Sequence, residues 1–255
     1  MSNHPSSFPA PSSARLTERV ALVAGGTGDL GQAVCRELAR AGMRVAVGYA
    51  ASRQRAETLA AELSGMALAL RAEEENAPVD AMRAVRERFG RLDVLVNAIG
   101  INREESAPAM RGEDWQKVVD VNLGFAFRLT QAAIPHMLPQ KYGRIVHLSS
   151  IAGRAGGRGQ INYAAAKAGL ERMARVFALE VGRKGVTVNC VAPGVIVSAM
   201  SQRMRGDHEQ ALLDCIACRR FGTPEEVARA VAFLASEDAA YINGAVLPVD
   251  GGMML

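Results

Sequence analysis

The sequence is short of cysteine and histidine and lacks a long apolar run. It holds four residues of each type, and no histidines fall in a metal-ligand spacing such as H-x3-H. Cys215 and Cys218 form a C-x2-C pair, but no second pair completes a tetrahedral metal site. No run approaches the roughly 18 apolar residues of a membrane span, and the first residues lack the apolar middle of a secretion signal. We therefore expect no metal, no membrane contact and a cytoplasmic protein with free thiols.

The charge is only mildly positive, with a net value of +4 at pH 7. Basic residues are scattered among acidic ones and form no patch, so we expect no nucleic-acid partner. A weak positive field also suits a phosphorylated, acidic or carrier-borne substrate.

Short apolar runs alternate with amphipathic segments of helical length from Val20 to the C-terminus, as in repeated βαβ units. We predict a single α/β domain of Rossmann type, doubly wound, with a seven-stranded parallel sheet and helices on both faces. Residues 16–255 would form this domain, and residues 1–15, rich in Pro and Ser, a disordered tail. Residues 198–220 are the candidate for a mobile lid. Strands are expected at 20–23, 44–49, 67–70, 94–97, 144–148, 186–191 and 245–248.

A glycine-rich stretch, "VALVAGGTGDLG", opens the domain. A strand, a turn with Gly25, Gly26, Gly28 and Gly31, and then a helix can deliver a diphosphate to the helix N-terminus. The alternative is an ordinary strand-to-helix turn, since such glycine patterns also occur by chance.

The end of the second predicted strand, "VAVGYAASRQR", bears on the choice of cofactor. An acid there would bind a ribose hydroxyl, whereas a 2′-phosphate requires neutral or basic surroundings. Tyr49 stands near that place, with Ser52 and Arg53 just beyond, which favours NADPH. Alternatively, Arg53 and Arg55 are only the solvated start of a helix.

Tyr163 and Lys167 are four residues apart in a predicted helix and so project from one face. An ammonium near a phenol favours the phenolate, which brings proton transfer by tyrosine closer to neutral pH. Ser150, at the end of a predicted strand, can donate a hydrogen bond to a substrate carbonyl at the same point. Taken alone, the pair could be a coincidence on a helix surface.

The ordered motifs of residues 16–255 resemble those of the short-chain dehydrogenase/reductase family. After the glycine loop come "LDVLVNAIGI", "WQKVVDVNLG", the Ser150, Tyr163 and Lys167 set, "VNCVAPGVIVSAM", "RRFGTPEEVA" and "INGAVLPVDGG". The resemblance implies that Tyr163 is the general acid for ketone reduction, that Ser150 orients the carbonyl, and that Lys167 lowers the pKa of the tyrosine and binds the nicotinamide ribose. It also implies that Asn122 holds a water in a proton relay. Together with the glycine loop and the end of the second strand described above, the predicted cofactor contacts are Gly25, Gly26, Thr27, Gly28, Asp29, Leu30, Gly31, Tyr49, Ser52, Arg53, Glu73, Asn97, Ala98, Gly100, Tyr163, Lys167, Pro193, Gly194, Ile196 and Ser198.

Two motifs depart from the family pattern. Ala24 stands in place of the usual Thr of the loop and Asp29 in place of its middle Gly, while Ala98 replaces the second Asn of the Asn-Asn-Ala-Gly motif. In the family the Thr hydroxyl ties the loop to that second motif, so this tie is altered at both ends. We expect Gly28 to take over the sharp turn, and Asp29 to lie at the helix start, where it would cap free N–H groups.

Within the family, the motifs are most similar to 3-oxoacyl-[acyl-carrier-protein] reductases and acetoacetyl-coenzyme A reductases. This implies reduction of a 3-oxoacyl thioester carried on acyl carrier protein or coenzyme A, a homotetramer, and carrier docking at Lys141, Arg183 and Lys184. The alternatives are a short-chain dehydrogenase for a sugar, polyol or steroid alcohol, and a non-catalytic NADPH-binding protein. Leu170, Met173, Ala174 and Phe177 would form either a subunit contact or intrachain core.

Overall fold

The computed structural model describes residues 19–198, 201 and 209–255. The predicted tail over residues 1–15, and residues 199–200 and 202–208 of the predicted lid, lie outside the described residues.

A seven-stranded parallel sheet forms the centre of the described structure, in the order β3-β2-β1-β4-β5-β6-β7. This confirms the predicted fold class, and every predicted strand boundary lies within two residues of the observed one. The strands are β1 (Val20–Ala24), β2 (Arg44–Tyr49), β3 (Met66–Ala69), β4 (Val94–Asn97), β5 (Gly143–Leu148), β6 (Val186–Pro193) and β7 (Val246–Val249).

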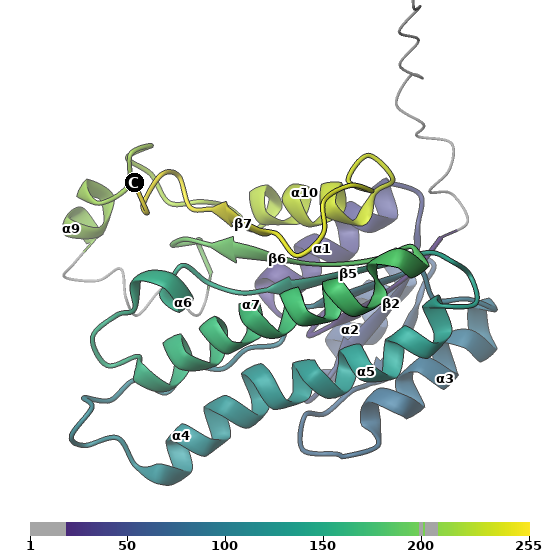
Figure 1. Cartoon of the computed structure of the whole chain (residues 1–255), viewed down its shortest axis with the longest axis horizontal. Coiled ribbons are helices and arrows are strands. Elements are labelled where there is room, and N and C mark those ends of the chain that lie inside the picture. Colours follow the sequence, from purple (N-terminus) through teal and green to yellow (C-terminus); the bar gives the residue numbers. More distant parts are fainter. Residues whose placement is uncertain (1–18, 199–200, 202–208) are drawn as a thin grey trace, which may run out of the picture.

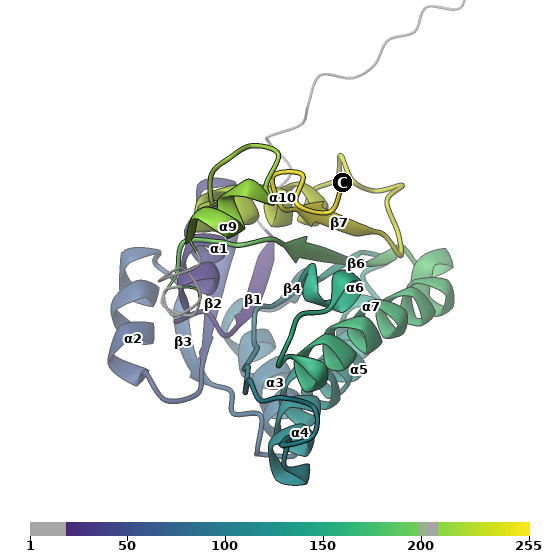
Figure 2. The same ribbon diagram turned by 90° about the vertical axis from the view of Figure 1, so that its left-hand side faces the viewer.

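Helices cover both faces of the sheet (Figures 1 and 2). Each face has its own apolar core, because the central strands are buried on both sides and carry apolar residues at nearly every position. One face packs against α1 (Asp29–Arg40), α2 (Arg53–Glu62) and α10 (Pro224–Ala235), and the other against α3 (Ala77–Phe89), α5 (Phe125–Met137) and α7 (Ile161–Val181). The remaining helical segments are α4 (Gly112–Val119), η2 (Asp120–Gly124), α6 (Ala152–Ala155), η3 (Gly182–Lys184) and α9 (Glu209–Asp214).

Local signals in the sequence fix where individual helices begin and end. The Thr223 hydroxyl accepts from the Glu226 N–H, and the Glu226 carboxylate accepts from the Thr223 N–H, which together form a capping box at the start of α10. Helix α3 ends at Gly90, whose φ of 81° is the left-handed conformation common after a helix.

The order of the strands predicts a ligand crevice at their carboxyl ends. Strand β1 lies between β2 and β4, so the connections that leave β1 and β4 run to opposite sides of the sheet. Open α/β sheets bind ligands at such a switch point. The candidate site is therefore expected beyond Ala24 and Asn97.

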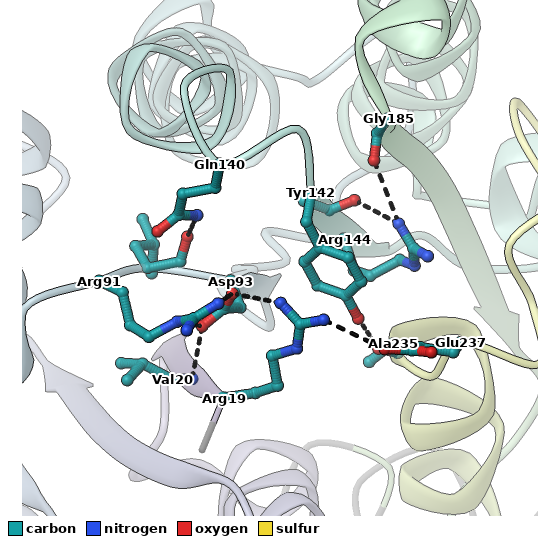
Figure 3. A network of polar contacts seen from close by, with 12 residues as sticks. Arg19, Val20, Arg91, Asp93, Gln140, Tyr142, Arg144, Gly185, Ala235 and Glu237 are labelled. Atoms are coloured by element: carbon teal, nitrogen blue, oxygen red, sulfur yellow. Dashed lines mark hydrogen bonds and ion pairs between the residues drawn. The ribbon is translucent and has the colours of Figure 1, made fainter. Parts of the chain in front are cut away.

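The amino ends of the strands are closed by a polar network (Figure 3). The buried Asp93 carboxylate accepts hydrogen bonds from Arg19, from Arg91 and from the backbone N–H of Val20. Two guanidinium groups lie close to the Tyr142 ring, Arg19 at 3.6 Å and Arg144 at 4.3 Å from its centroid. This network joins β1, β4 and β5 at their amino ends, opposite the crevice.

No helix in the described part of the chain is both long and apolar enough to cross a membrane.

Candidate active site

The glycine loop after β1 makes its sharp turn at Gly25, whose φ is 76°. A Cβ there would lie 3.0 Å from the carbonyl group of Ala98, and a Cβ at Gly31 would lie 2.1 Å from the Gly25 oxygen. The prediction that Gly28 takes over the turn is wrong: Gly28 is the N-cap of α1, with an ordinary φ of −75°. The turn falls at Gly25 because only there must the chain pass so close to the β4 end.

Asp29 is the first residue of α1 and is exposed, as expected for an acid at a helix start. Together with Thr27 and Gly28, it forms the outer rim of the loop, while Gly26 and Gly31 are buried beneath. The Gly26 N–H donates to the Gly48 carbonyl of β2 at 2.8 Å, which fixes the loop to the neighbouring strand. The backbone of this loop and the N-terminal end of α1 form a cradle suited to a diphosphate.

Three arginines surround the end of β2, where the sequence shows no acid. Ser52 is the N-cap of α2, and Arg53 is directed along that helix by a 2.8 Å ion pair with Glu57. Arg55 instead donates to the Thr27 carbonyl at 3.4 Å, and Arg71 to the Ala50 carbonyl at 3.1 Å.

Sequence reasoning misses Arg71, because an exposed arginine after a strand gives no signal of its own. In the structure Arg55 and Arg71 each donate to a backbone carbonyl of the loops after β1 and β2, whereas Arg53 pairs with Glu57. Tyr49, which ends β2, is buried.

Glu73, a predicted cofactor contact, lies at the surface and pairs with a lysine of α4. Its carboxylate forms a 2.6 Å ion pair with Lys117 of α4, and this hydrogen bond holds the pKa of Glu73 below its usual value. The side chain of Glu73 is 61% exposed, so its position favours a surface ion pair.

Ser150, Tyr163 and Lys167 converge as predicted. Ser150 follows the carboxyl end of β5, and the other two lie one turn apart on α7. The Ser150 hydroxyl accepts from the Ala152 N–H at 3.1 Å and lies near enough to the Tyr163 phenol to lower the pKa of that phenol. The two hydroxyl groups together can bind one carbonyl oxygen.

The electrostatics of this group differ from the sequence-based expectation. Burial raises the pKa of Tyr163, and the hydrogen bond from Ser150 only partly opposes this. Lys167 was expected to lower that pKa, but its Nζ donates to the Leu148 carbonyl at 2.8 Å and lies 5.5 Å from the Tyr163 ring centroid. Burial in turn lowers the pKa of Lys167 to about 8. At neutral pH the phenol is thus protonated, the form that can donate a proton.

Asn122 lies beside Lys167 in the π-helical turn η2. Its Nδ2 donates to the carbonyls of Ile101 and Val118, at 2.9 and 2.8 Å. Its Oδ1 is buried, and no group in the described parts of the chain donates to it. A Cβ at Gly100 would lie 3.0 Å from this oxygen and 3.3 Å from the Lys167 Nζ, so a side chain there would crowd both groups. An unsatisfied acceptor next to an ammonium suits a bound water.

The segment after β4 is held by Asn97. Its buried side-chain oxygen accepts from the Ile99 N–H at 3.2 Å, and the Ala98 N–H donates to the Ala24 carbonyl at 2.9 Å. The backbone thus joins the two motifs although Ala24 and Ala98 carry no polar side chains.

The segment that follows β6 forms another wall of the crevice. The Pro193 carbonyl accepts from the Ile151 N–H at 3.1 Å, which joins this wall to the Ser150 segment. A Cβ at Gly194 would lie 2.8 Å from the Asp250 Cα. Ile196 is buried, and the Ser198 N–H donates to the Ser201 hydroxyl.

The candidate docking residues lie at the amino ends of the strands, opposite the crevice. Lys141 precedes β5, while Arg183 and Lys184 form part of η3, which precedes β6. All three are exposed. The length of β5 separates them from Ser150 in the same subunit.

The helix residues considered for a subunit contact divide into two pairs. Leu170 and Ala174 are fully buried in the intrachain core, whereas Met173 and Phe177 are half-buried.

Comparison with known proteins agrees with this geometry. The family model described as enoyl-(acyl carrier protein) reductase matches residues 26–254. The chain is 43% identical over 246 residues to the 3-oxoacyl-[acyl-carrier-protein] reductase of Synechocystis sp., covering 94% of this chain and 98% of that protein. It is 38% identical over 239 residues to the 3-oxoacyl-[acyl-carrier-protein] reductase FabG of Escherichia coli, covering 93% of this chain and 98% of that protein.

Two solved structures share the fold closely. The crystal structure of gox2181 has a TM-score of 0.91 at 34% identity and covers 95% of this chain and 98% of its own. A putative gluconate dehydrogenase from Agrobacterium tumefaciens has a TM-score of 0.90 at 29% identity, with 94% and 97% covered. The motifs, the fold and these relatives agree, and the chain belongs to the short-chain dehydrogenase/reductase family.

Proposed function

We propose that this protein reduces a 3-oxoacyl thioester to the 3-hydroxyacyl thioester with NADPH. The observation that carries the proposal is the convergence of Ser150 and Tyr163 beside Lys167, in a chain that aligns over nearly its full length with named 3-oxoacyl reductases.

The residues of the crevice fit a dinucleotide cofactor. The cradle at Gly25 and Gly31 leaves no room for side chains, so a diphosphate can approach the backbone. Arg55 and Arg71 supply positive charge near the end of β2, which favours NADPH over NADH. The Asn97–Gly100 segment and the Pro193–Ser198 wall would enclose the nicotinamide end. When bound, the nicotinamide supplies the hydride for the carbonyl carbon.

The protein's own groups would handle the oxygen and the proton. Ser150 donates a hydrogen bond to the carbonyl oxygen, and the protonated Tyr163 gives its proton to that oxygen as negative charge develops. The Lys167 ammonium stabilises the phenolate that remains. A water on the Asn122 oxygen then returns a proton from solvent through Lys167.

Ketone reduction is favoured over reduction of a carbon–carbon double bond, although the family model is described as an enoyl reductase. Two hydroxyl groups that converge on one point suit the oxygen of a 3-oxo group. The 3-oxoacyl relatives also cover more than nine-tenths of the chain.

The carrier would dock across a subunit contact. Phe127 of α5 and Val176 of α7 are exposed apolar side chains, 44% and 54% accessible. They suit two-fold packing of α5 and α7 against a second copy, and such a contact would lie within the homotetramer that we propose. Helix α7 has 21 residues, so it is about 30 Å long. In an antiparallel pair, Arg183 and Lys184 of one subunit would approach the crevice of the next, where together with Lys141 they can attract an acidic carrier.

We also propose that the enzyme acts in the cytoplasm, where the exposed thiols of Cys215 and Cys218 would stay reduced.

A second candidate is oxidation of a sugar acid or polyol. The structural similarity to a putative gluconate dehydrogenase favours it, since that chain has nearly the same fold over 97% of its length. The same Ser150, Tyr163 and Lys167 set would then act in the reverse direction, with the phenolate as base.

The test is a comparison of substrates with the purified protein. We expect NADPH oxidation at 340 nm with acetoacetyl-coenzyme A, and little with crotonyl-coenzyme A or with gluconate and either oxidised cofactor. Carrier-bound substrate should react faster, and charge reversal at Lys141 and Lys184 should remove that advantage while sparing the coenzyme A substrate. Turnover of gluconate alone would support the second candidate. NADPH binding without turnover of any substrate would indicate a non-catalytic sensor.

A further inference from the structure

His147 lies in the middle of a buried polar chain that the proposed reaction does not use. It stands on β5, opposite Asn97 of β4 in the ladder, and is fully buried. Its Nδ1 is 3.5 Å from the Asn97 Nδ2, and its Nε2 is 3.2 Å from the Thr130 hydroxyl of α5. Both ring nitrogens therefore have partners.

The partners fix the tautomer of the ring. The Thr130 hydroxyl donates its proton to the Ala126 carbonyl at 2.8 Å, so its oxygen must accept from an Nε2–H of His147. Nδ1 then accepts from Asn97, whose side-chain oxygen is already turned toward the Ile99 N–H. Burial and the nearby Lys167 ammonium lower the pKa of His147 to about 3. The ring is thus neutral at physiological pH and is not a general acid or base.

The hydrogen bonds of His147 and Asn97 lead to the segment Ala98–Gly100, which separates the two halves of the crevice. The Ala98 carbonyl lies against Gly25 of the phosphate loop, and Gly100 lies against Lys167 and the Asn122 oxygen. Asn97 holds this segment through Ile99. A turn of the Asn97 amide would therefore shift both the cradle and the groups beside Lys167.

The side chains at positions 24 and 98 cannot provide this support, because both are alanine. We propose that His147 is a positioning residue that fixes the Asn97 amide, and through it the segment Ala98–Gly100, and so sets the affinity for the nicotinamide cofactor. The inference rests on the proposed function, since it requires that the crevice binds NADPH.

The test compares equilibrium binding of NADPH, followed by its fluorescence, in three variants. His147→Leu removes both hydrogen bonds at similar volume, and we expect the Kd to rise about tenfold, as for the loss of one or two buried hydrogen bonds. His147→Gln keeps one acceptor and one donor in a planar group, and we expect a rise of less than about threefold.

Asn189→Leu on β6 is the matched control. Asn189 is equally buried, but its side chain bonds Ile242 and Ala245 near the amino end of β7. It should lower the melting temperature as much as His147→Leu and leave the Kd unchanged. With acetoacetyl-coenzyme A saturating, His147→Leu should raise the KM for NADPH more than it lowers kcat.

Two results would overturn the inference: a folded His147→Leu protein that binds NADPH as tightly as the natural chain, or a loss of affinity that Asn189→Leu shares. If the natural chain binds no NADPH, the proposed function fails first, and this inference fails with it. Binding by the natural chain with no difference among the variants sinks only the role of His147.

Discussion

Tyr142 and Tyr163 are both partly buried and both lie beside cations, but at opposite ends of the same sheet. Burial raises the pKa of each phenol. At the amino end, the guanidinium groups of Arg19 and Arg144 both contact the Tyr142 ring. At the carboxyl end, the Tyr163 hydroxyl faces Ser150 in the crevice.

The charges at the two ends are satisfied to different degrees. The Asp93 carboxylate accepts from two arginines and one backbone N–H. The ammonium of Lys167 has a backbone carbonyl as its hydrogen-bond acceptor in the described structure, and the Asn122 oxygen beside it has no donor there. Fully paired groups stabilise a fold, whereas buried groups with unused capacity reduce stability and leave positions for a ligand or water. The amino end is built for stability and the carboxyl end for binding.

The largest effect should come from removing one hydroxyl group at each end. Tyr163→Phe is expected to lower kcat about a thousandfold, because it removes the proposed proton donor, with little change in melting temperature. Tyr142→Phe loses only a 3.4 Å hydrogen bond to Ala235, so its kcat should stay within about twofold and its stability within about 1 kcal/mol of the natural chain. Steady-state kinetics and thermal melts of both variants test this, and equal losses of activity would contradict the division between the ends.

A second test breaks the amino end alone. Asp93→Ala leaves Arg19 and Arg91 without their shared carboxylate and the Val20 N–H without its acceptor. We expect a loss of about 3 kcal/mol in the free energy of unfolding, measured with urea. Below the melting temperature, kcat and the Kd for NADPH should not change. If the affinity for NADPH falls as well, the two ends are coupled through β4.

A third test replaces Lys167 at the carboxyl end, where we expect the substitution to raise the free energy of unfolding instead of lowering it. The pKa of Lys167 falls from 10.5 to about 8 on folding, so below pH 8 the folded protein bears a buried charge that costs about 3 kcal/mol. Between pH 8 and 10.5 the folded state releases this proton before the unfolded state does, and the cost declines. Lys167→Met removes the ammonium that would stabilise the phenolate, so we expect no activity. Because it also removes the buried charge, the variant should be more stable by about 2 kcal/mol at pH 7.

The pH dependence checks the cause of this gain. The difference in unfolding free energy between Lys167→Met and the natural chain should shrink as pH rises from 8 to 10. A variant that is less stable at pH 7 would show that the Lys167 to Leu148 hydrogen bond outweighs desolvation.

The sequence predicted the fold and the candidate catalytic set because both depend on local patterns. Apolar runs marked each strand within two residues, and the spacing of Tyr163 and Lys167 placed them on one helix face. The direction of the Tyr163 pKa could not be predicted, since it depends on how much protein packs around the phenol. The role of His147 depends on the pairing of β4 with β5, and a lone histidine in a strand gives no indication of its partners.

The smallest effect concerns Asp29, the acid in the phosphate loop. The structure places it as the first residue of α1, on the exposed rim, while the turn itself is made by Gly25. A carboxylate at a helix start is stabilised by the dipole, so it can stay away from the diphosphate. Asp29→Gly should therefore change the Kd for NADPH less than tenfold, under about 1.4 kcal/mol, and should lower the melting temperature slightly. Fluorescence titration measures the first and calorimetry the second. A variant that binds NADPH far more tightly would mean that the Asp29 carboxylate faces the phosphates and weakens binding. The carboxyl end of the sheet would then hold two costly charges: Asp29, which lowers cofactor affinity, and Lys167, which lowers stability.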